Sequence, residues 1–140
     1  MPIPFETRRC RIRPFEEGDI ETFMSYRNNM DWMRFQGFKG KKYLEYKAAL
    51  LMQPKFHQGV QLAVVSRQNG ELLGDLYLKM EKNVAWIGYT VAPQYARQGL
   101  AFEVVSQLLL QLKQTGLTLA KAGVEEQNLA SIALLRKLGF

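Results

Sequence analysis

Three strand-like segments follow one another in the middle of the chain with no helix between them, at residues 60–67, 71–80 and 84–91. The first two flank Asn69-Gly70, a dipeptide that is typical of tight β-hairpin turns. Pro93 closes the third segment, because proline cannot donate a hydrogen bond to a neighbouring strand. Consecutive strands with short links pair with their neighbours, so we expect an antiparallel meander.

The meander leads directly into an amphipathic helix. From Leu100 onward, apolar residues recur at spacings of three and four, and Gly116 supplies the left-handed position that ends the helix. This apolar stripe comprises Ala101, Val104, Val105, Leu108, Leu109 and Leu112. A short strand over 117–124 follows, and then a helix over 128–140 with Asn128 as its N-cap. The strand, helix, strand order predicts a parallel pair with a right-handed crossover, and therefore a mixed α/β sheet.

The amino-terminal third predicts one strand and two helices. The segment 7–15 alternates apolar and basic residues, which is the pattern of a half-buried strand. One helix is expected within 16–29, with Asp19 as its N-cap, and another within 41–53. The full order is β-α-α-β-β-β-α-β-α, and residues 1–140 fit a single domain.

The composition is that of an ordinary globular protein, with 47% hydrophobic and 23% charged residues. No apolar run reaches the length of a membrane span, and the amino end lacks the apolar core of a signal peptide. We therefore expect a cytoplasmic location and no membrane partner. A single cysteine, Cys10, excludes an internal disulfide, and with a single histidine, His57, we expect no metal site.

The net charge of +6 suggests an anionic partner, such as a polyphosphate ligand, nucleic acid or an acidic protein. Arginines gather near the amino end at Arg8, Arg9, Arg11 and Arg13. A basic nucleic-acid binder is one interpretation of this cluster. We favour the other, a solvated edge strand, and expect no nucleic-acid partner.

The helix that starts at Leu100 has no acidic or hydroxyl residue in position to cap it. Its free N–H groups and about half a positive charge are therefore left for something else. Gly99 lets a ligand approach the main chain closely, Arg97 adds a positive charge, and the amides of residues 98–101 suit a pyrophosphate. A hydrated helix start, with Gly99 serving only close packing, is the alternative. Neither a dinucleotide-binding glycine motif nor a P-loop is present.

Two motifs in the second half, IGYTVAPQYARQGLAFEVV and VEEQNLASIALLRKLGF, together resemble the GNAT superfamily of N-acetyltransferases. The nearest branch includes the Rim-type enzymes, which acetylate the N-terminal alanine of ribosomal proteins. The stretch RRCRIRPFEEGDIETF also resembles that branch, so the resemblance covers nearly the whole chain. It implies a GNAT-like acyl-CoA N-acyltransferase fold. It also implies acetyl-CoA as co-substrate, with transfer of the acetyl group to a primary amine of a protein N-terminus or a small molecule.

The resemblance implies a set of cofactor contacts. In the family, a loop of pattern Q/R-x-x-G-x-G/A wraps the pyrophosphate with main-chain amides, and here it is ARQGLA. Ala96 therefore replaces the usual Gln or Arg, and Arg97 is the residue that would compensate. The implied contacts are Thr90, Val91, Ala92, Ala96, Arg97, Gln98, Gly99, Leu100, Ala101, Asn128 and Ser131. For Asn128 a plain N-cap is the alternative, and one side chain can serve both purposes.

The resemblance supplies no general base or acid. Trp86 occupies the position where related enzymes often have a carboxylate. Leu135 occupies the position where many have a tyrosine that acts as a general acid. Asp75 and Tyr89 are the nearest candidates, and Asp75 could be a base only if burial or a neighbour raises its pKa. A hydrogen-bonded or solvated strand residue is the alternative for Asp75. A main-chain N–H of the strand 84–91 would stabilise the oxyanion.

Family members usually continue beyond the motif that ends here at Phe140 with two more strands. We therefore expect a carboxyl-terminally truncated domain that lacks these strands, and an open sheet edge that invites association with a second copy. The same departure motivates an alternative function, a non-catalytic coenzyme A-binding or assembly module. Acceptor specificity is expected within residues 19–58.

Overall fold

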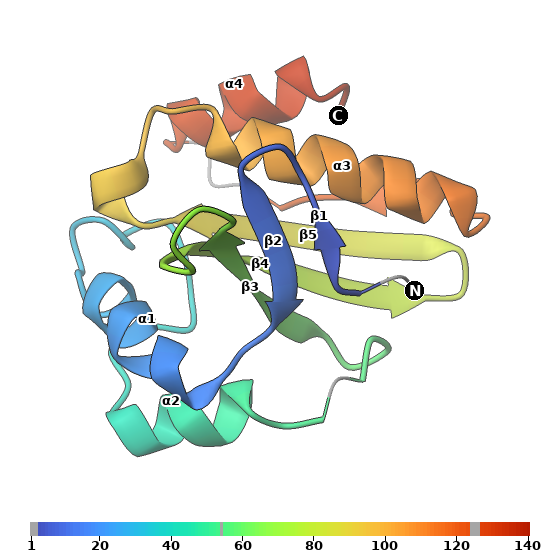
Figure 1. The fold of residues 1–140 in the computed structure, drawn as a ribbon. Coiled ribbons are helices and arrows are strands. Elements are labelled where there is room, and N and C mark those ends of the chain that lie inside the picture. Colours follow the sequence, from blue (N-terminus) through green and yellow to red (C-terminus); the bar gives the residue numbers. More distant parts are fainter. Residues whose placement is uncertain (1–2, 54, 124–126) are drawn as a thin grey trace.

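The computed structural model describes residues 3–53, 55–123 and 127–140, and its centre is a six-stranded sheet (Figure 1). The strands follow their chain order across the sheet: β1 (Phe5–Glu6), β2 (Cys10–Pro14), β3 (Val60–Ser66), β4 (Leu72–Glu81), β5 (Val84–Val91) and β6 (Leu119–Lys121). The helices are α1 (Ile20–Arg27), α2 (Tyr43–Leu50), α3 (Leu100–Gln114) and α4 (Leu129–Lys137). Short 3₁₀ turns precede α1 at Glu17–Asp19 and α3 at Pro93–Tyr95.

The pairing pattern confirms the predicted mixed sheet. The pairs from β1–β2 to β4–β5 are antiparallel, and β5 and β6 are parallel. The strand predicted over 7–15 is shorter in the structure, as β2, and β1 before it was not predicted. A turn between Thr7 and Cys10 joins the two and lets Phe5 pair with Ile12. The predicted strand over 117–124 is shorter as β6, and Val124 lies outside the described residues.

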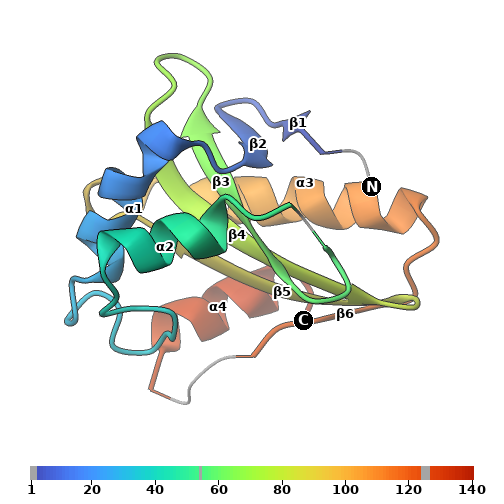
Figure 2. The ribbon, with the colours of Figure 1, turned by 90° about the horizontal axis from the view of Figure 1, so that it is seen from below.

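Helices cover both faces of the sheet (Figures 1 and 2). One face packs against α3 through aliphatic side chains, and the buried members of this cluster include Ile12, Leu62, Leu76, Leu78, Ile87, Val104, Val105, Leu108 and Leu112. The other face packs against α1 and α2 through a more aromatic cluster that includes Phe15, Phe23, Tyr26 and Tyr46. The strand alternation of side chains therefore gives β5 two chemically different surfaces.

The helix ends follow their local sequence, with one exception. Gly116 has φ of +86°, and Leu117 N–H donates to Leu112 O over 3.3 Å, so α3 ends in the expected left-handed cap. Asn128 Oδ1 accepts a 3.2 Å hydrogen bond from Ser131 N–H and caps α4. Asp19 is the N-cap residue of α1, as predicted, but its carboxylate makes no capping hydrogen bond and accepts one from Arg13 instead.

Strand β5 is paired along its full length on one side only. Its pairing with β6 joins Val84 to Leu119 and ends where Trp86 faces Lys121, while β4 remains paired with β5 as far as Val91. Ala92 N–H donates to Leu73 O of the β4 side over 2.8 Å. Because main-chain groups alternate along a strand, those of Val91 and Tyr89 face the opposite side, where β6 has diverged. This divergence creates an open strand edge inside the sheet.

Candidate active site

Two adjoining clefts lie along the open edge of β5. The large cleft, of about 430 Å³, is lined by Asp31, Trp32, Arg34, Phe35, Gln36, Tyr89, Thr90, Val91, Ala96, Arg97, Ala101, Asn128, Ala130 and Ser131. The small cleft, of about 230 Å³, is lined by Phe35, Gln36, Gly37, Ile87, Gly88, Tyr89, Ala122, Gly123, Asn128 and Ser131. The residues that line both clefts mark the junction between them, and its polar members are Gln36, Tyr89, Asn128 and Ser131.

The start of α3 opens onto the large cleft and is not capped by a side chain. Gly99 is the N-cap with φ of +77°, and Arg97 two residues earlier has φ of +62°. Within the described ranges, no hydrogen-bond acceptor is found for the main-chain N–H groups of residues 98–102. The amides and the positive end of the helix dipole are therefore available to an anion.

The acidic residue in the first turn of α3, Glu103, forms hydrogen bonds with the β1–β2 turn and does not cap the helix. The Glu103 carboxylate accepts hydrogen bonds from Thr7 Oγ1 (2.5 Å), Arg9 N (2.9 Å) and Arg9 Nε (2.7 Å). Burial acts to raise the pKa of Glu103, but these three bonds outweigh it and hold that pKa below its usual value. Glu103 thus anchors α3 to the β1–β2 turn and leaves the helix end to Arg97 and the amides.

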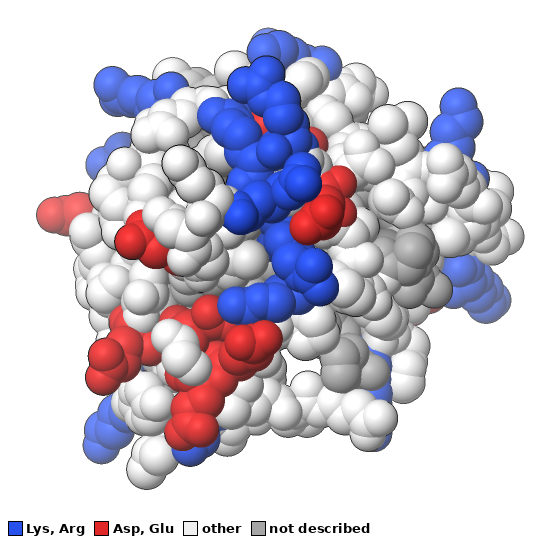
Figure 3. Space-filling view, in the orientation of Figure 1, with Lys and Arg blue, Asp and Glu red and all other residues white. Residues whose placement is uncertain are grey.

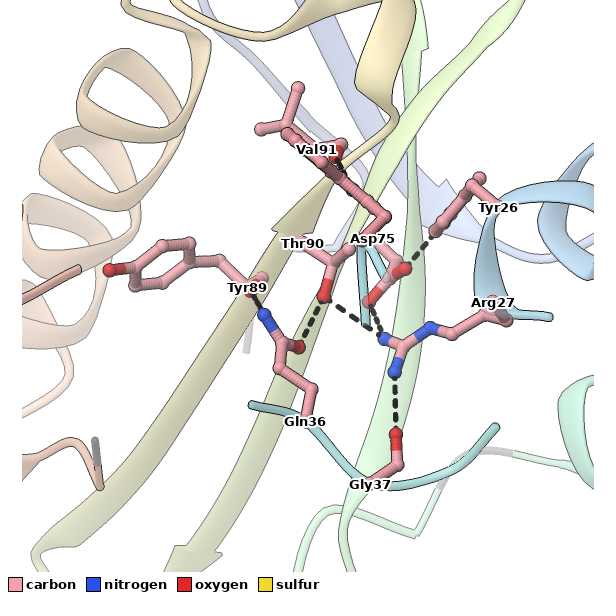
Figure 4. Close-up of polar contacts among 9 residues, drawn as sticks. Tyr26, Arg27, Gln36, Gly37, Asp75, Tyr89, Thr90 and Val91 are labelled. Carbon is pink, nitrogen blue, oxygen red and sulfur yellow. Dashed lines mark hydrogen bonds and ion pairs between the residues drawn. The ribbon is translucent and has the colours of Figure 1, made fainter. Parts of the chain in front are cut away.

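A buried polar network lies behind β5, on the face toward α1 (Figure 4). Arg27 Nη2 donates to Asp75 Oδ1 over 2.6 Å, Tyr26 Oη donates to Asp75 Oδ2, and Arg27 Nη1 donates to Gly37 O over 3.1 Å. Both charged side chains are almost entirely buried. Burial raises the pKa of Asp75, while the charge of Arg27 and the hydrogen bonds from Tyr26 and Arg27 act against this. Asp75 is therefore a hydrogen-bonded strand residue, and its role as a base stays a prediction.

The network reaches the open edge of β5 through Thr90 and Gln36. Arg27 Nη2 also contacts Thr90 Oγ1 at 3.3 Å, and Thr90 Oγ1 donates to Gln36 Oε1 over 2.5 Å. Gln36 Nε2 in turn donates to Tyr89 O over 3.3 Å. The same loop supplies Trp32, whose Nε1 donates to Val91 O over 2.9 Å. The α1–α2 loop thus covers the two exposed carbonyls of β5.

Tyr89 points to the opposite face of the sheet from Asp75 (Figure 4). Its hydroxyl donates to Ser131 Oγ of α4 over 3.0 Å. Burial raises the pKa of Tyr89, and the bond to Ser131 opposes this only in part, so the phenol is protonated at neutral pH. The two predicted catalytic candidates consequently cannot act on the same atom from one side.

The structure brings most of the predicted cofactor residues together. Those that line the large cleft are Thr90, Val91, Ala96, Arg97, Ala101, Asn128 and Ser131. Ala92 is buried and does not line this cleft. Gln98, Gly99 and Leu100 lie at the start of α3, but they do not line this cleft either. Of the three strand residues predicted to pair with the pantetheine arm, Val91 is the one whose main chain faces the open edge.

Three residues of the site escaped the sequence analysis, namely Arg27, Trp32 and Gln36. Arg27 falls at the helical spacing of the apolar residues of α1, but a single arginine there does not indicate which residue it pairs with. Trp32 and Gln36 lie within residues 19–58, where acceptor specificity was expected, but neither belongs to a motif. Their partners Asp75, Thr90 and Val91 lie between 48 and 63 residues away along the chain. Such pairings have no local signal.

Basic side chains form a stripe over β2 (Figure 3). The arginines before and along this strand are Arg8, Arg9, Arg11 and Arg13. Most have acidic neighbours: Glu103 lies 2.7 Å from Arg9, Glu6 lies 3.7 Å from Arg11, and Asp19 lies 2.7 Å from Arg13. Much of the positive charge on this face is therefore compensated locally.

The described residues contain neither a metal-binding cluster of side chains nor a helix able to span a membrane. No group of three or more His, Cys, Asp and Glu side chains is arranged there to hold a metal ion. None of the helices in the same ranges is both long and apolar enough to cross a bilayer.

Comparisons with known proteins agree with this geometry. The protein YoaA of Bacillus subtilis (strain 168), described as an uncharacterized N-acetyltransferase, is 29% identical over 150 residues, covering 100% of this chain and 83% of that protein. The fold resembles that of a GNAT-family acetyltransferase from Bacillus anthracis, with a TM-score of 0.85 and 21% identity over 98% of this chain and 82% of the other. It also resembles RimL, a ribosomal L7/L12 alpha-N-protein acetyltransferase solved in complex with coenzyme A, with a TM-score of 0.81 and 16% identity over 96% of this chain and 81% of the other.

The family model described as "Acetyltransferase (GNAT) domain" matches residues 9–140. The match includes the open edge of β5, the uncapped start of α3 and the α1–α2 loop that faces them. The predicted resemblance is confirmed, and the chain belongs to the GNAT acetyltransferase family.

Proposed function

We propose that this chain transfers the acetyl group of acetyl-CoA to a primary amine of a peptide N-terminus or a small molecule. The observation that carries the proposal is the uncapped start of α3, which opens with Arg97 onto a cleft along the unpaired edge of β5. A pyrophosphate fits the helix amides, and an extended arm with amide groups fits the edge of a strand. Coenzyme A contains both.

The charges of the large cleft support a phosphate-bearing donor. Arg34 and Arg97 both line it, and the positive end of the α3 dipole adds to their field. Asp31 is the one carboxylate among its described lining residues. A polyphosphate would consequently enter a cleft of net positive charge. This is the kind of anionic ligand that the overall charge of +6 suggested.

The chemistry is addition to a thioester followed by elimination. The nitrogen lone pair attacks the carbonyl carbon, the carbonyl electron pair moves to oxygen, and collapse of the tetrahedral intermediate breaks the C–S bond. The amine loses one proton and the thiolate gains one, so the products are an amide and the free thiol. Holding amine and thioester together supplies a large part of the rate.

The catalytic roles of Tyr89 and Asp75 remain predictions in this scheme. Tyr89 is a protonated phenol at the junction of the clefts, which suits proton donation to the leaving thiolate. Asp75 has both carboxylate oxygens in hydrogen bonds and lines neither cleft, which suits a structural role behind the site.

The second candidate is a coenzyme A-binding module without turnover. What favours it is the scarcity of bases, because Asp31 is the sole carboxylate among the described lining residues of both clefts. The two functions differ in one measurement. Release of free thiol from acetyl-CoA above background, in the presence of any primary amine, would exclude the module.

The test of the donor site is a calorimetric titration of the purified chain with acetyl-CoA. We expect saturable binding near one ligand per chain. The substitution Gly99→Val should weaken it by more than about tenfold, because a β-branched residue is strained at a positive φ and crowds the helix amides.

The matched control is Gly70→Val, because Gly70 also has a positive φ, of +75°, but lies in the β3–β4 hairpin away from both clefts. Equal loss of affinity in the two variants would show that strain alone is responsible. Unchanged affinity in Gly99→Val would count against the pyrophosphate site.

A further inference from the structure

The side-chain amide of Gln36 stands at the junction of the two clefts, since Gln36 lines both. An amide nitrogen carries two N–H donors. One of them is used on Tyr89 O, and the described residues provide no partner for the other. If the acyl donor occupies one cleft and the amine the other, as the proposed function requires, this donor lies where the two would meet.

The orientation of this amide is fixed by a chain of donors that begins at Arg27. A guanidinium can only donate, so the Thr90 hydroxyl oxygen accepts from Arg27 and sends its own proton to Gln36 Oε1. The nitrogen of the Gln36 amide is thereby turned toward Tyr89 O and the clefts. Figure 4 shows this sequence of contacts running from behind β5 to its open edge.

The buried pair of Arg27 and Asp75 is costly to maintain for stability alone. Two charges removed from water are often no more stable than a well-packed apolar pair of the same volume. In addition, the described residues offer no hydrogen-bond partner for Arg27 Nε, although that atom is buried. Burying Arg27 costs desolvation energy and leaves one of its N–H groups without a partner in the described part of the chain. The buried guanidinium is therefore better explained by the residues that it holds in position.

We propose that Gln36 is a catalytic residue that donates a hydrogen bond from Nε2 to the carbonyl oxygen of the acyl donor, and that Arg27 is the residue that positions it through Thr90. The inference rests on the proposed function and deepens it. As the amine adds, the carbonyl oxygen gains a negative charge that a fixed amide donor stabilises. The same bond is weaker to the neutral thioester, so the contribution grows toward the transition state.

The first experiment needs no acceptor. We compare the affinities of acetyl-CoA and S-ethyl-CoA, a thioether of similar size that lacks the carbonyl oxygen. The wild-type chain should bind acetyl-CoA about fivefold more tightly, the effect of one hydrogen bond. In Gln36→Leu this preference should disappear, while the affinity for S-ethyl-CoA should stay within about twofold. Gln111→Leu is the matched control, because Gln111 is a half-buried glutamine of α3 that lines neither cleft.

Thr90 tests the link to Arg27, because removing Arg27 itself leaves the buried Asp75 carboxylate unpaired. Thr90→Val deletes the hydroxyl with little change of shape and should lose most of the preference. Thr90→Ser keeps the hydroxyl and should retain the preference. The double variant Gln36→Leu with Thr90→Val should be no worse than Gln36→Leu alone, since both changes remove the same donor.

Turnover provides the second readout, with any primary amine that supports thiol release. Gln36→Leu should lower kcat by about 100-fold and raise the KM for acetyl-CoA by only about fivefold. A wild-type chain that binds neither ligand would overturn the proposed function and this inference with it. A wild-type chain that binds both equally would overturn the inference alone. An unchanged preference in Thr90→Val would remove Arg27 from it.

Discussion

The two faces of the sheet at β5 differ in the residues that cover them and in the interactions that they form. Toward α3, the face is aliphatic, and main-chain amides are left open at the helix start. Toward α1, the face is aromatic and contains a buried ion pair that holds a loop by side-chain hydrogen bonds. The first arrangement depends on backbone geometry, so we expect it to tolerate substitutions that keep the main chain in place. The second depends on particular side chains and tolerates little.

The largest expected effect comes from breaking the side-chain network. Asp75→Ala leaves Arg27 as an unpaired buried cation and should lower the free energy of unfolding by about 3–5 kcal/mol. Denaturant titration measures this. The double variant Asp75→Leu with Arg27→Met should recover much of the loss, because no charge then remains buried. A double variant that is as unstable as Asp75→Ala would show that packing, not charge, dominates this face.

On the aliphatic face, stability and ligand binding should separate. Leu108 is fully buried between α3 and the sheet, so Leu108→Ala should cost about 2–4 kcal/mol through the cavity that it creates. The affinity for acetyl-CoA should remain unchanged, because the amides at the start of α3 keep their positions. Calorimetry beside denaturant titration checks both statements. A parallel loss of affinity would mean that the helix start shifts when its packing is loosened.

Much of the aliphatic face is predictable from sequence because its signals are local. The Asn69-Gly70 turn, the stripe of α3, the cap at Gly116 and the N-cap Asn128 each lie within a few residues of the structure that they determine. The motif around Gly99 is local in the same way, because it lies at the helix start whose backbone it shapes. The predicted cofactor residues on this side lie together for that reason, and their contacts with a cofactor stay a prediction.

The hydrogen-bond network on the face toward α1 could not be predicted, because it depends on pairs of residues that are far apart in the sequence. Arg27 and Asp75 are 48 residues apart, and each alone resembles a solvated residue of a helix or strand. The position of Gln36 depends on both, through Thr90. Strand β1 was missed for a related reason, since two residues are too few to show alternation.

A smaller, pH-dependent effect is expected where α3 is anchored to the β1–β2 turn. Glu103 has a folded-state pKa below its unfolded value, so its contribution is present above about pH 4.3 and is lost as the pH falls through the folded-state pKa. Glu103→Gln should reduce stability at neutral pH by about 1 kcal/mol and flatten the loss of stability in acid. Unfolding midpoints from pH 3 to 7 measure this, roughly spanning the carboxylate titration range. Glu81→Gln, at an exposed strand end, is the control.

The smallest effect is expected on the basic stripe. Arg11 is half exposed and lies 3.7 Å from Glu6, so Arg11→Ala should change the free energy of unfolding by less than about 0.5 kcal/mol. The change should shrink further in high salt. A loss above about 1 kcal/mol that persists in salt would show that the stripe supports the edge of the sheet.

The divergence of β6 from β5 also has a consequence for solvent exchange. The amides of Gly88 and Thr90 face β4, whereas those of Tyr89 and Val91 face the diverging side. In the free protein, amide hydrogens should therefore exchange with deuterium alternately slowly and quickly from one residue to the next along a single strand. An extended ligand that pairs with the edge should slow the fast members alone. Half of a strand would then report ligand binding while the other half reports the stability of the sheet.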